Sequence, residues 1–483
     1  MAMMELDGTR SWLDRLWSSI ADRGRAYVSG PDPAVVSAQD RVRWLAEALV
    51  SERGEASGAA VARDLQEAVR ALSSEDRLSF YRFLAENFGP EPERLRRAAE
   101  AWLAEPTSEH AVRLADAAEP PRQELLRRMN MSPGGTAALI ALRRELLGLL
   151  REHPELKPLE SDLRHLLGSW FNRGFLELHR IDWQTPAAVL EKLIAYEAVH
   201  EIQGWEDLRR RLAADRRCFG FFHPALPGEP LIFVQVALTE GLASAIQPLL
   251  ARDGDEAAHA AQAARADTAI FYSISNCQDG LRGISFGNFL IKQVVEELKA
   301  ELPELMRFAT LSPVPGFRRW LEPKLAAGEL PFREEERAAL LAANGGGEDA
   351  ATAIAALLGR ERWWEDQAVV AALRGPLMRL SAEYLTAAND SRGPADPVAR
   401  FHLGNGARLE RVNWLGNLSP RAMRESFGLM VNYLYDREAI EANHEAFAHG
   451  GRVVRSPEVE ALLRGPSGSL LSRIRPREGA PAR

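Results

Sequence analysis

The stretch from Thr268 to Phe317 constrains the fold of this chain of 483 residues more than any other. Its first residues, Thr268 to Ser273, are mostly β-branched and aromatic, as in a buried strand. From Phe289 the apolar residues recur with a helical period, and Arg307 to Leu311 then has the composition of a second short strand. The stretch therefore predicts a strand, a glycine-containing loop, a helix and a second strand, in that order.

The loop of this unit brings Gly283 and Gly287 to the start of the predicted helix. Glycines allow backbone N–H groups to approach a ligand closely, and a helix N-terminus carries a partial positive charge, so the two together suit a phosphate group. A plain turn between a strand and a helix explains the same pattern equally well. The loop alone therefore does not decide between a binding site and a structural turn.

The length, charge and cysteine content of the chain limit the classes of protein to which it can belong. A chain of this length is expected to form about two or three domains. The net charge of -8 and the pI near 5.8 argue against nucleic acid as the main partner. Cys218 and Cys277 are the only cysteines, which excludes a disulfide framework and a cysteine-rich zinc site and favours a reducing compartment. The sequence shows neither a secretory signal nor a run of about 18 apolar residues for a membrane span, so we expect a cytoplasmic protein with no membrane partner.

The first third of the chain predicts a helical domain. Helical apolar spacing occurs in Asp40–Val50, Ala59–Leu72, Ser74–Phe88, Pro92–Ala104, Pro121–Asn130 and Thr136–Glu152. Ser73, followed by Asp76, has the pattern of a helix N-cap. The leucines from residue 139 to residue 150 form a wide stripe, which fits either a bundle core or a contact between subunits. Because aromatic residues gather between Ser161 and Trp183, we predict a helical domain over residues 1–180 and a second domain over residues 181–483.

Strand signals begin only after that boundary. Arg217 to Phe222 and Leu231 to Leu238 predict two strands joined by a turn that contains Pro and Gly. Further on, Asn405-Gly406 stands between two apolar runs, which predicts a hairpin with His402 on its first strand. A single His in a strand is more often structural than catalytic, so this pattern by itself assigns His402 no role.

Seven segments of the chain, in this order, resemble those of the malonyl-CoA decarboxylase family. They are Gly228-Glu-Pro-Leu231, Ala269-Ile-Phe-Tyr-Ser-Ile-Ser275, Gly280-Leu-Arg-Gly283, Gly287-Asn-Phe-Leu-Ile-Lys292, Leu311-Ser-Pro-Val-Pro-Gly-Phe317, Phe401-His-Leu-Gly-Asn-Gly-Ala407 and Gly428-Leu-Met-Val-Asn-Tyr433. The resemblance covers the region from Arg217 to Tyr435, and the helical first third fits the family's architecture. Collinear motifs identify a family far more specifically than one glycine loop does.

The resemblance implies an α+β protein with an N-terminal all-α helical bundle domain for oligomerisation. An acetyltransferase-like (GNAT-type) α/β catalytic domain that binds malonyl-CoA would follow it. The implied reaction converts malonyl-CoA to acetyl-CoA and CO2 with neither a metal nor an organic cofactor. By the same resemblance we expect a homotetramer, built as a dimer of dimers, whose small-molecule partner is an acyl-CoA.

The resemblance also implies site residues, with Ser312 and His402 as the catalytic pair. The glycine loop that holds the nucleotide end of the substrate maps onto Arg282, Gly283, Ile284, Ser285, Phe286, Gly287 and Asn288. Asn432 and Tyr435 are further candidates. Loss of CO2 from a malonyl thioester leaves an enolate, whose oxygen must be stabilised and whose carbon must be protonated. We hypothesise that Ser312 and His402 hydrogen-bond each other, that His402 donates the proton, and that Ser312 contacts the substrate carboxylate or passes the proton.

Two departures from the family pattern concern Ser285 and the C-terminus. Ser285 stands where relatives such as the animal enzymes are expected to carry an acidic residue, and the chain ends without the Ser-Lys-Leu peroxisomal address. Both fit a bacterial cytoplasmic enzyme.

Ser285 also completes G-x-S-x-G, the nucleophile elbow of α/β-hydrolases. An elbow follows its strand directly, whereas the predicted strand ends ten positions before Gly283.

Other functions are open at this point. A CoA-dependent acyltransferase of the GNAT superfamily would share the fold and the glycine loop, because a fold does not fix a function. A non-catalytic CoA-sensing or scaffold protein would bind acyl-CoA without turnover. A zinc enzyme is disfavoured, because His444 and His449 are one residue too far apart for the H-E-x-x-H pattern.

Overall fold

The computed structural model describes residues 36–51, 55–252, 254–284, 290–387 and 394–464, together with residues 16, 19, 20, 22 and 23. The chain divides into two compact units. The first comprises Met1–Glu201, Phe219–Phe233 and Ser275–Gly287, and the second comprises Ile202–Cys218, Val234–Ile274 and Asn288–Arg483. Within the described ranges, no helix is both long enough and apolar enough to cross a membrane.

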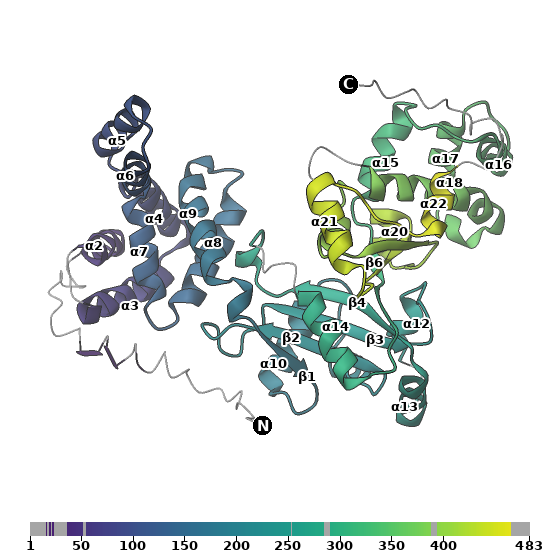
Figure 1. Cartoon of the computed structure of the whole chain (residues 1–483), viewed down its shortest axis with the longest axis horizontal. Helices are drawn as coiled ribbons and strands as arrows, with labels where there is room; N and C mark the ends of the chain where they lie inside the picture. Colours follow the sequence, from purple (N-terminus) through teal and green to yellow (C-terminus); the bar gives the residue numbers. More distant parts are fainter. Residues whose placement is uncertain are drawn as a thin grey trace, which may run out of the picture. The chain divides into compact units, whose positions relative to one another are not determined.

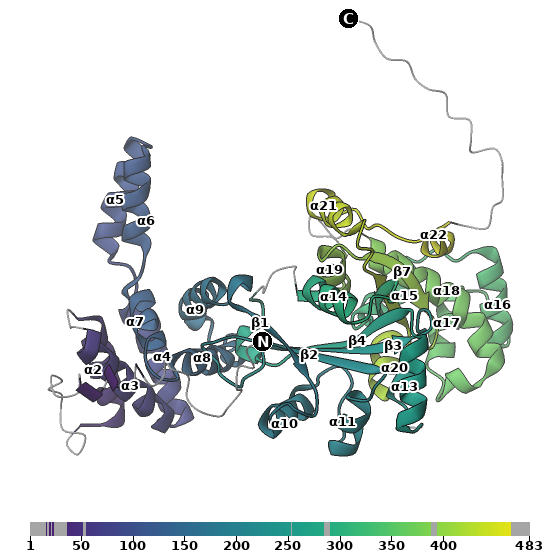
Figure 2. The same ribbon diagram turned by 60° about the horizontal axis from the view of Figure 1, so that its bottom comes forward.

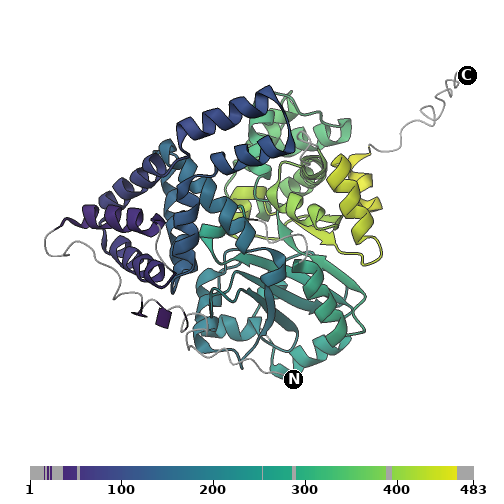
Figure 3. The ribbon, with the colours of Figure 1, turned by 60° about the vertical axis from the view of Figure 1, so that its left-hand side comes forward.

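The first unit is built largely of helices, drawn in purple and blue in Figure 1 and Figure 3. They are α2 (Ala38–Val50), α3 (Glu55–Ala71), α4 (Ser74–Asn87), α5 (Pro92–Ala104), α6 (Ser108–Ala118), α7 (Pro121–Asn130), α8 (Gly135–Leu149), α9 (Lys157–Trp170) and α10 (Ala187–Tyr196), with short 3-10 turns η2 (Pro154–Leu156) and η3 (Arg173–Phe175). All six predicted helices are present. α5 and α7 have the predicted bounds because each begins at a proline, which suits the first turn of a helix. The predicted N-cap is also confirmed, since the Ser73 hydroxyl accepts the Asp76 N–H at 3.1 Å.

The leucine stripe of α8 lies partly in the core of this unit. Leu139 and Leu146 are fully buried, and so are Leu159 and Leu163 of α9. Burial of this kind stabilises the fold by roughly 1.5–3 kcal/mol for each large apolar side chain. The core interpretation of the stripe is therefore confirmed, and its use as a contact between subunits stays a prediction.

The strands form one mixed sheet in the described part of the chain, with the order β1-β2-β3-β4-β5-β8-β6 and with β7 paired to β8. Figure 2 labels β1, β2, β3, β4 and β7 of this sheet. The strands are β1 (Glu177–Ile181), β2 (Arg216–Phe222), β3 (Ile232–Thr239), β4 (Thr268–Asn276), β5 (Arg307–Thr310), β6 (Ser312–Pro313), β7 (Arg408–Asn413) and β8 (Met430–Leu434). β5, β6 and β7 each run antiparallel to β8. A helical N-terminal region is thus followed by a mixed sheet, which confirms the predicted α+β architecture.

Among the described residues, the predicted strand, helix and second strand of this unit are present. β4 and β5 are parallel, with Thr268 opposite Arg307 and Phe271 opposite Thr310. Between them runs α14 (Leu290–Glu301), whose buried residues are the predicted apolar stripe. A crossover helix of this kind is what two parallel neighbouring strands require. The unit places the end of β5, and with it Ser312, beside β8.

The remaining helices belong to the second unit, apart from the 3-10 turn η4 (Asp279–Leu281) in the first. They are α11 (Trp205–Arg211), α12 (Gln247–Leu250), α13 (Glu256–Arg265), α15 (Phe317–Ala326), α16 (Glu334–Asn344), α17 (Ala350–Leu358), α18 (Gln367–Thr386), α19 (Pro397–Gly404), α20 (Pro420–Ser426), α21 (Ile440–Gly450) and α22 (Pro457–Leu463), with the 3-10 turn η5 (Trp363–Glu365).

The prediction that His402 lies on a strand of a hairpin is wrong, because His402 lies in the last turn of α19. Asp396 caps this helix by accepting the N–H groups of Val398 and Ala399, and Pro397 opens its first turn. Gly406 adopts a positive φ of 82° and turns the chain from the helix into β7. The Asn-Gly signal therefore marks a helix-to-strand connection instead of a hairpin turn.

Candidate active site

Ser312 and His402 come together inside the second unit. Ser312 lies in β6 opposite Val431 of β8, and α19 brings His402 to it from 90 positions along the chain. The Ser312 Oγ and His402 Nε2 atoms are 3.2 Å apart. Both residues are nearly enclosed, with 5% of Ser312 and 3% of His402 exposed. The structure thus has the contact that the sequence predicted, and the catalytic role of the pair stays a proposal.

The Tyr435 hydroxyl holds the other nitrogen of the ring, because it lies 2.8 Å from His402 Nδ1. Burial raises the pKa of this hydroxyl well above its ordinary value, so it stays protonated and can donate. Ser312 Oγ in turn donates to Thr310 Oγ1 at 2.9 Å. The hydroxyl hydrogens of Tyr435 and Ser312 and the ring hydrogen of His402 each need an acceptor. Among the contacts of the described residues, this need is met when Tyr435 donates to Nδ1, the Nε2–H of His402 donates to Ser312, and Ser312 donates to Thr310.

The His402 ring is held in an aromatic environment. It stacks on Tyr433 with ring centroids 4.8 Å apart and an interplanar angle of 24°. Burial lowers the pKa of His402 to about 3, because the enclosed site disfavours the charged imidazolium. The ring is therefore neutral near pH 7, and its Nε2–H is a hydrogen-bond donor beside Ser312.

Asn432 supports this site from β8. Its amide nitrogen donates to the carbonyl oxygens of Thr310 at 2.7 Å and Ala243 at 3.0 Å. Its oxygen accepts from Arg411 Nε at 3.1 Å and Asn413 Nδ2 at 2.9 Å. These four bonds use both donors and both lone pairs of the amide. A direct contact between Asn432 and a substrate would have to replace one of them, so the structure favours a supporting place for this residue.

The predicted nucleotide loop belongs to the first unit as far as Gly287. Arg282 and Gly283 are exposed, and Ile284 is buried. Gly283 has a positive φ of 79°, which residues other than glycine rarely adopt. Ser285, Phe286, Gly287 and Asn288 lie outside the described residues. Since β4 ends at Asn276 and η4 intervenes before Gly283, the requirement of a nucleophile elbow for a strand that runs straight into its turn is not met.

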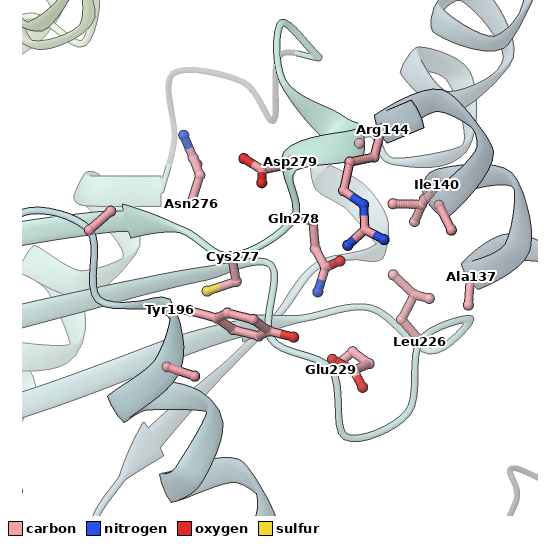
Figure 4. Close-up of a pocket in the computed structure, with 14 residues that line it drawn as sticks. Ala137, Ile140, Arg144, Tyr196, Leu226, Glu229, Asn276, Cys277, Gln278 and Asp279 are labelled. Carbon is pink, nitrogen blue, oxygen red and sulfur yellow. The ribbon is translucent and has the colours of Figure 1, made fainter. Parts of the chain in front are cut away.

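A cavity of about 430 Å³ opens beside this loop, within the first unit (Figure 4). Its wall comes from α8, the end of α10, the turn between β2 and β3, and residues Asn276 to Gly280. Figure 4 shows the side chains of Arg144 and Gln278 entering from one side, with the Tyr196 ring and Glu229 opposite. Burial and the nearby Glu229 carboxylate raise the pKa of Tyr196, so its hydroxyl is neutral. Sequence patterns did not find this cavity, because its lining comes from four separate segments.

The two histidines of the zinc-like pattern lie on α21. His444 Nδ1 is 2.7 Å from the Gly404 carbonyl oxygen, and the exposed His449 pairs with Glu445 at 2.9 Å. In the part of the chain that the structure covers, no cluster of three or more His, Cys, Asp or Glu side chains is arranged to hold a metal ion.

Comparison with known proteins places these features in a family. The family model described as the malonyl-CoA decarboxylase C-terminal domain matches residues 174–472, and that of the N-terminal domain matches residues 88–171. The crystal structures of malonyl-CoA decarboxylases from Rhodopseudomonas palustris and Agrobacterium vitis each share 49% sequence identity with this chain and a TM-score of 0.79, covering 88% of this chain and 100% of theirs. The mitochondrial malonyl-CoA decarboxylase of Anser anser anser is 40% identical over 355 residues, which is 71% of this chain and 69% of that protein. On these matches, the chain belongs to the malonyl-CoA decarboxylase family.

Proposed function

We propose that the chain converts malonyl-CoA to acetyl-CoA and CO2 and that Ser312 and His402 carry the reaction. The observation that supports this most directly is the buried contact between these two side chains, 3.2 Å apart, in a member of this family. Such a reaction makes the chain a carboxy-lyase. The catalytic roles below are part of the proposal.

The reaction itself sets what the site must do. Breaking the bond between the carboxylate and the methylene carbon releases CO2 and leaves the electron pair on the thioester as an enolate. The enolate carbon then takes up one proton, so that malonyl-CoA and a proton give acetyl-CoA and CO2. A site of low dielectric with fixed hydrogen-bond donors stabilises the enolate more than water does.

His402 and Ser312 have the chemistry for the proton transfer. Although burial keeps the ring neutral, a substrate carboxylate beside it would favour the imidazolium and so draw a proton from solvent. Ser312 then gives its hydroxyl proton to the enolate carbon and regains one from His402 Nε2. The added proton sits on Nδ1, and the Tyr435 hydroxyl, 2.8 Å away, turns from donor to acceptor to hold it.

The glycine loop is proposed to hold the nucleotide end of the substrate, from Arg282 to Asn288. Support comes from Gly283, whose positive φ and exposure leave its backbone open to a ligand. An added Cβ on Gly283 would meet nothing within 4 Å among the described atoms. Open space of this kind is what a phosphate group needs in order to approach backbone N–H groups.

A direct assay separates this function from its alternatives. Purified protein and malonyl-CoA are incubated with and without a mixture of amines, and CO2, acetyl-CoA and free CoA thiol are measured. We expect CO2 and acetyl-CoA in equal amounts, with no free thiol and no effect of the amines. Free thiol that depends on an amine would favour an acyltransferase, and binding of CoA without any product would favour a sensing or scaffold protein.

We also propose a cytoplasmic homotetramer, with no metal or organic cofactor. Assembly is supported by apolar side chains that α5 and α6 leave exposed in the single chain, namely Trp102 (37%), Leu103 (73%) and Val112 (61%). The two helices that carry them contact each other, and exposed apolar groups on one surface commonly mark contacts between subunits. Light scattering would give the mass of the assembly, and replacement of Leu103 and Val112 by Asp should reduce it.

A further inference from the structure

Arg143 is the most enclosed arginine of α8, with 1% of its surface exposed, and it joins the helical region to the glycine loop. Its Nη1 donates to the Gly280 carbonyl oxygen at 2.6 Å, and its Nη2 donates to the Arg282 carbonyl oxygen at 2.9 Å. Glu160 of α9 accepts from Nε at 3.2 Å and from Nη2 at 2.9 Å. The guanidinium is thus fixed on one side by a carboxylate and on the other by two loop carbonyls, all within the first unit.

The loop also touches the backbone of α8. A Cβ on Gly280 would lie 2.1 Å from the Ile140 carbonyl oxygen, a distance at which the backbone must move. Ile140 precedes Arg143 by three positions, so both residues are on the same face of the helix. Gly280 is therefore required by close approach, and the helix and the arginine together determine where the loop lies.

The two fixed carbonyls orient the peptide groups of the loop. In a trans peptide the C=O and the following N–H point in opposite directions. Because the Arg282 carbonyl faces Arg143, the N–H of Gly283 faces away from the guanidinium. This N–H has no hydrogen bond to any other described residue, and no described atom lies within 4 Å of the place that a Cβ on Gly283 would take.

We propose that Arg143, held by Glu160, is a positioning residue that aims the Gly283 N–H at the phosphates of the bound acyl-CoA. The inference rests on the proposed function, because it takes the loop as the phosphate site. Arg143 is too enclosed to touch the substrate, and Glu160 neutralises its charge. Its effect on binding therefore passes through the loop, which gives the helical region a part in substrate binding besides assembly.

The same region offers a matched control in Arg122 of α7, which is 4% exposed. Arg122 Nε donates to Asp162 at 2.6 Å, and its Nη1 donates to the Ala85 carbonyl oxygen at 2.9 Å. This is again a buried ion pair to α9 with a bond to a backbone carbonyl, but the carbonyl belongs to α4. Replacing Arg122 removes comparable bonds and leaves the glycine loop untouched.

The test compares Arg143→Gln with Arg122→Gln in the full chain. Calorimetry gives the Kd for acetyl-CoA, initial rates give KM and kcat for malonyl-CoA, and hydrogen exchange follows the peptide that spans residues 277–284. For Arg143→Gln we expect Kd and KM to rise by about tenfold or more, which is the effect of losing a hydrogen bond to a charged group. We expect kcat to change by less than about threefold, and exchange in that peptide to become faster. Arg122→Gln should lower thermal stability similarly without changing Kd or KM.

Wild-type Kd and KM in a folded Arg143→Gln protein would overturn the inference, as would an equal rise in Arg122→Gln. If Arg143→Gln does not fold, Arg143→Lys and Glu160→Gln are tested in the same comparison with Arg122→Gln. Each weakens the hydrogen bonds around the guanidinium of Arg143 and keeps most of the volume of the replaced side chain. If the wild type binds acetyl-CoA but forms no product, the proposed function fails and the Kd comparison still tests the positioning role. A wild type that binds no CoA at all would refute both.

Discussion

Replacing His402 with glutamine should remove a pH dependence that the buried ring imposes on the stability of the fold. Burial lowers the pKa of His402 from 6.5 to about 3. Between these two pH values the ring is therefore protonated in the unfolded chain and neutral in the folded chain. Stability from this group is present above pH 6.5 and is lost as the pH falls toward 3. The loss is about 1.4 kcal/mol for each pH unit within that window.

The expected change in unfolding free energy can be worked out for two pH values at which the protein is easily handled. Between about pH 7.5 and about pH 5 the linkage amounts to about 2 kcal/mol of unfolding free energy. Glutamine at position 402 can still offer an amide N–H to Ser312 and an oxygen to Tyr435, but it does not titrate. The difference in unfolding free energy between wild type and variant should therefore shrink by that amount at the lower pH.

Urea unfolding of both proteins at the two pH values measures this difference, and other titrating groups, including the half-buried His223, cancel between them. The His402 ring signals in NMR, assigned by their absence from the variant, should show no titration near pH 6.5. A difference that stays constant within about 0.5 kcal/mol, or a ring that titrates with an ordinary midpoint, would refute the buried neutral imidazole.

Three further substitutions test the supports of the site. Tyr435→Phe removes the hydroxyl 2.8 Å from His402 Nδ1, and should lower kcat by about tenfold with folding intact; an unchanged kcat would show that the bond does not matter to turnover. Asn432→Ala breaks the four hydrogen bonds of a buried amide and should lower the unfolding free energy by about 2–4 kcal/mol, measured in urea; a loss below about 1 kcal/mol would contradict this. Gly316→Ala places a Cβ 2.2 Å from the hydroxyl of Tyr384, which donates to Asp396, the N-cap of α19. The variant should have an unfolding free energy about 1–3 kcal/mol lower than the wild type, and equal stability in urea would mean that this contact relaxes freely.

Local patterns predicted the strand, helix and strand that lead to Ser312, but not β8 or α19, which complete the site. The strand from Thr268, the helix of α14 and the strand from Arg307 could be found because β-branched runs and a helical apolar period are properties of adjacent residues. The same patterns misplace His402, because Asn405-Gly406 predicts a hairpin turn, whereas Asp396 caps a helix there with Pro397 in its first turn. Asp-Pro before an apolar run was the signal that favoured a helix.

The parts that the sequence did not predict depend on contacts between distant segments. Nothing adjacent to Arg143 indicates that it bonds the carbonyl of Gly280, 137 positions away. Thr310 and Tyr433 likewise became neighbours of Ser312 and His402 only through the pairing of β8 with β5 and β6. The pair Ser312 and His402 came from the family resemblance, because no local pattern joins two residues 90 positions apart.

The most direct test of the central proposal is release of CO2 from malonyl-CoA by the wild type, Ser312→Ala and His402→Gln in a buffer that contains a chelator. Acetyl-CoA binding is measured on the same preparations as the control for folding and for the nucleotide site. We predict chelator-resistant turnover by the wild type and a loss of kcat of about 100-fold or more in each variant, with acetyl-CoA bound as tightly as before. A variant that binds acetyl-CoA and still releases CO2 at the wild-type rate would contradict the roles proposed for Ser312 and His402.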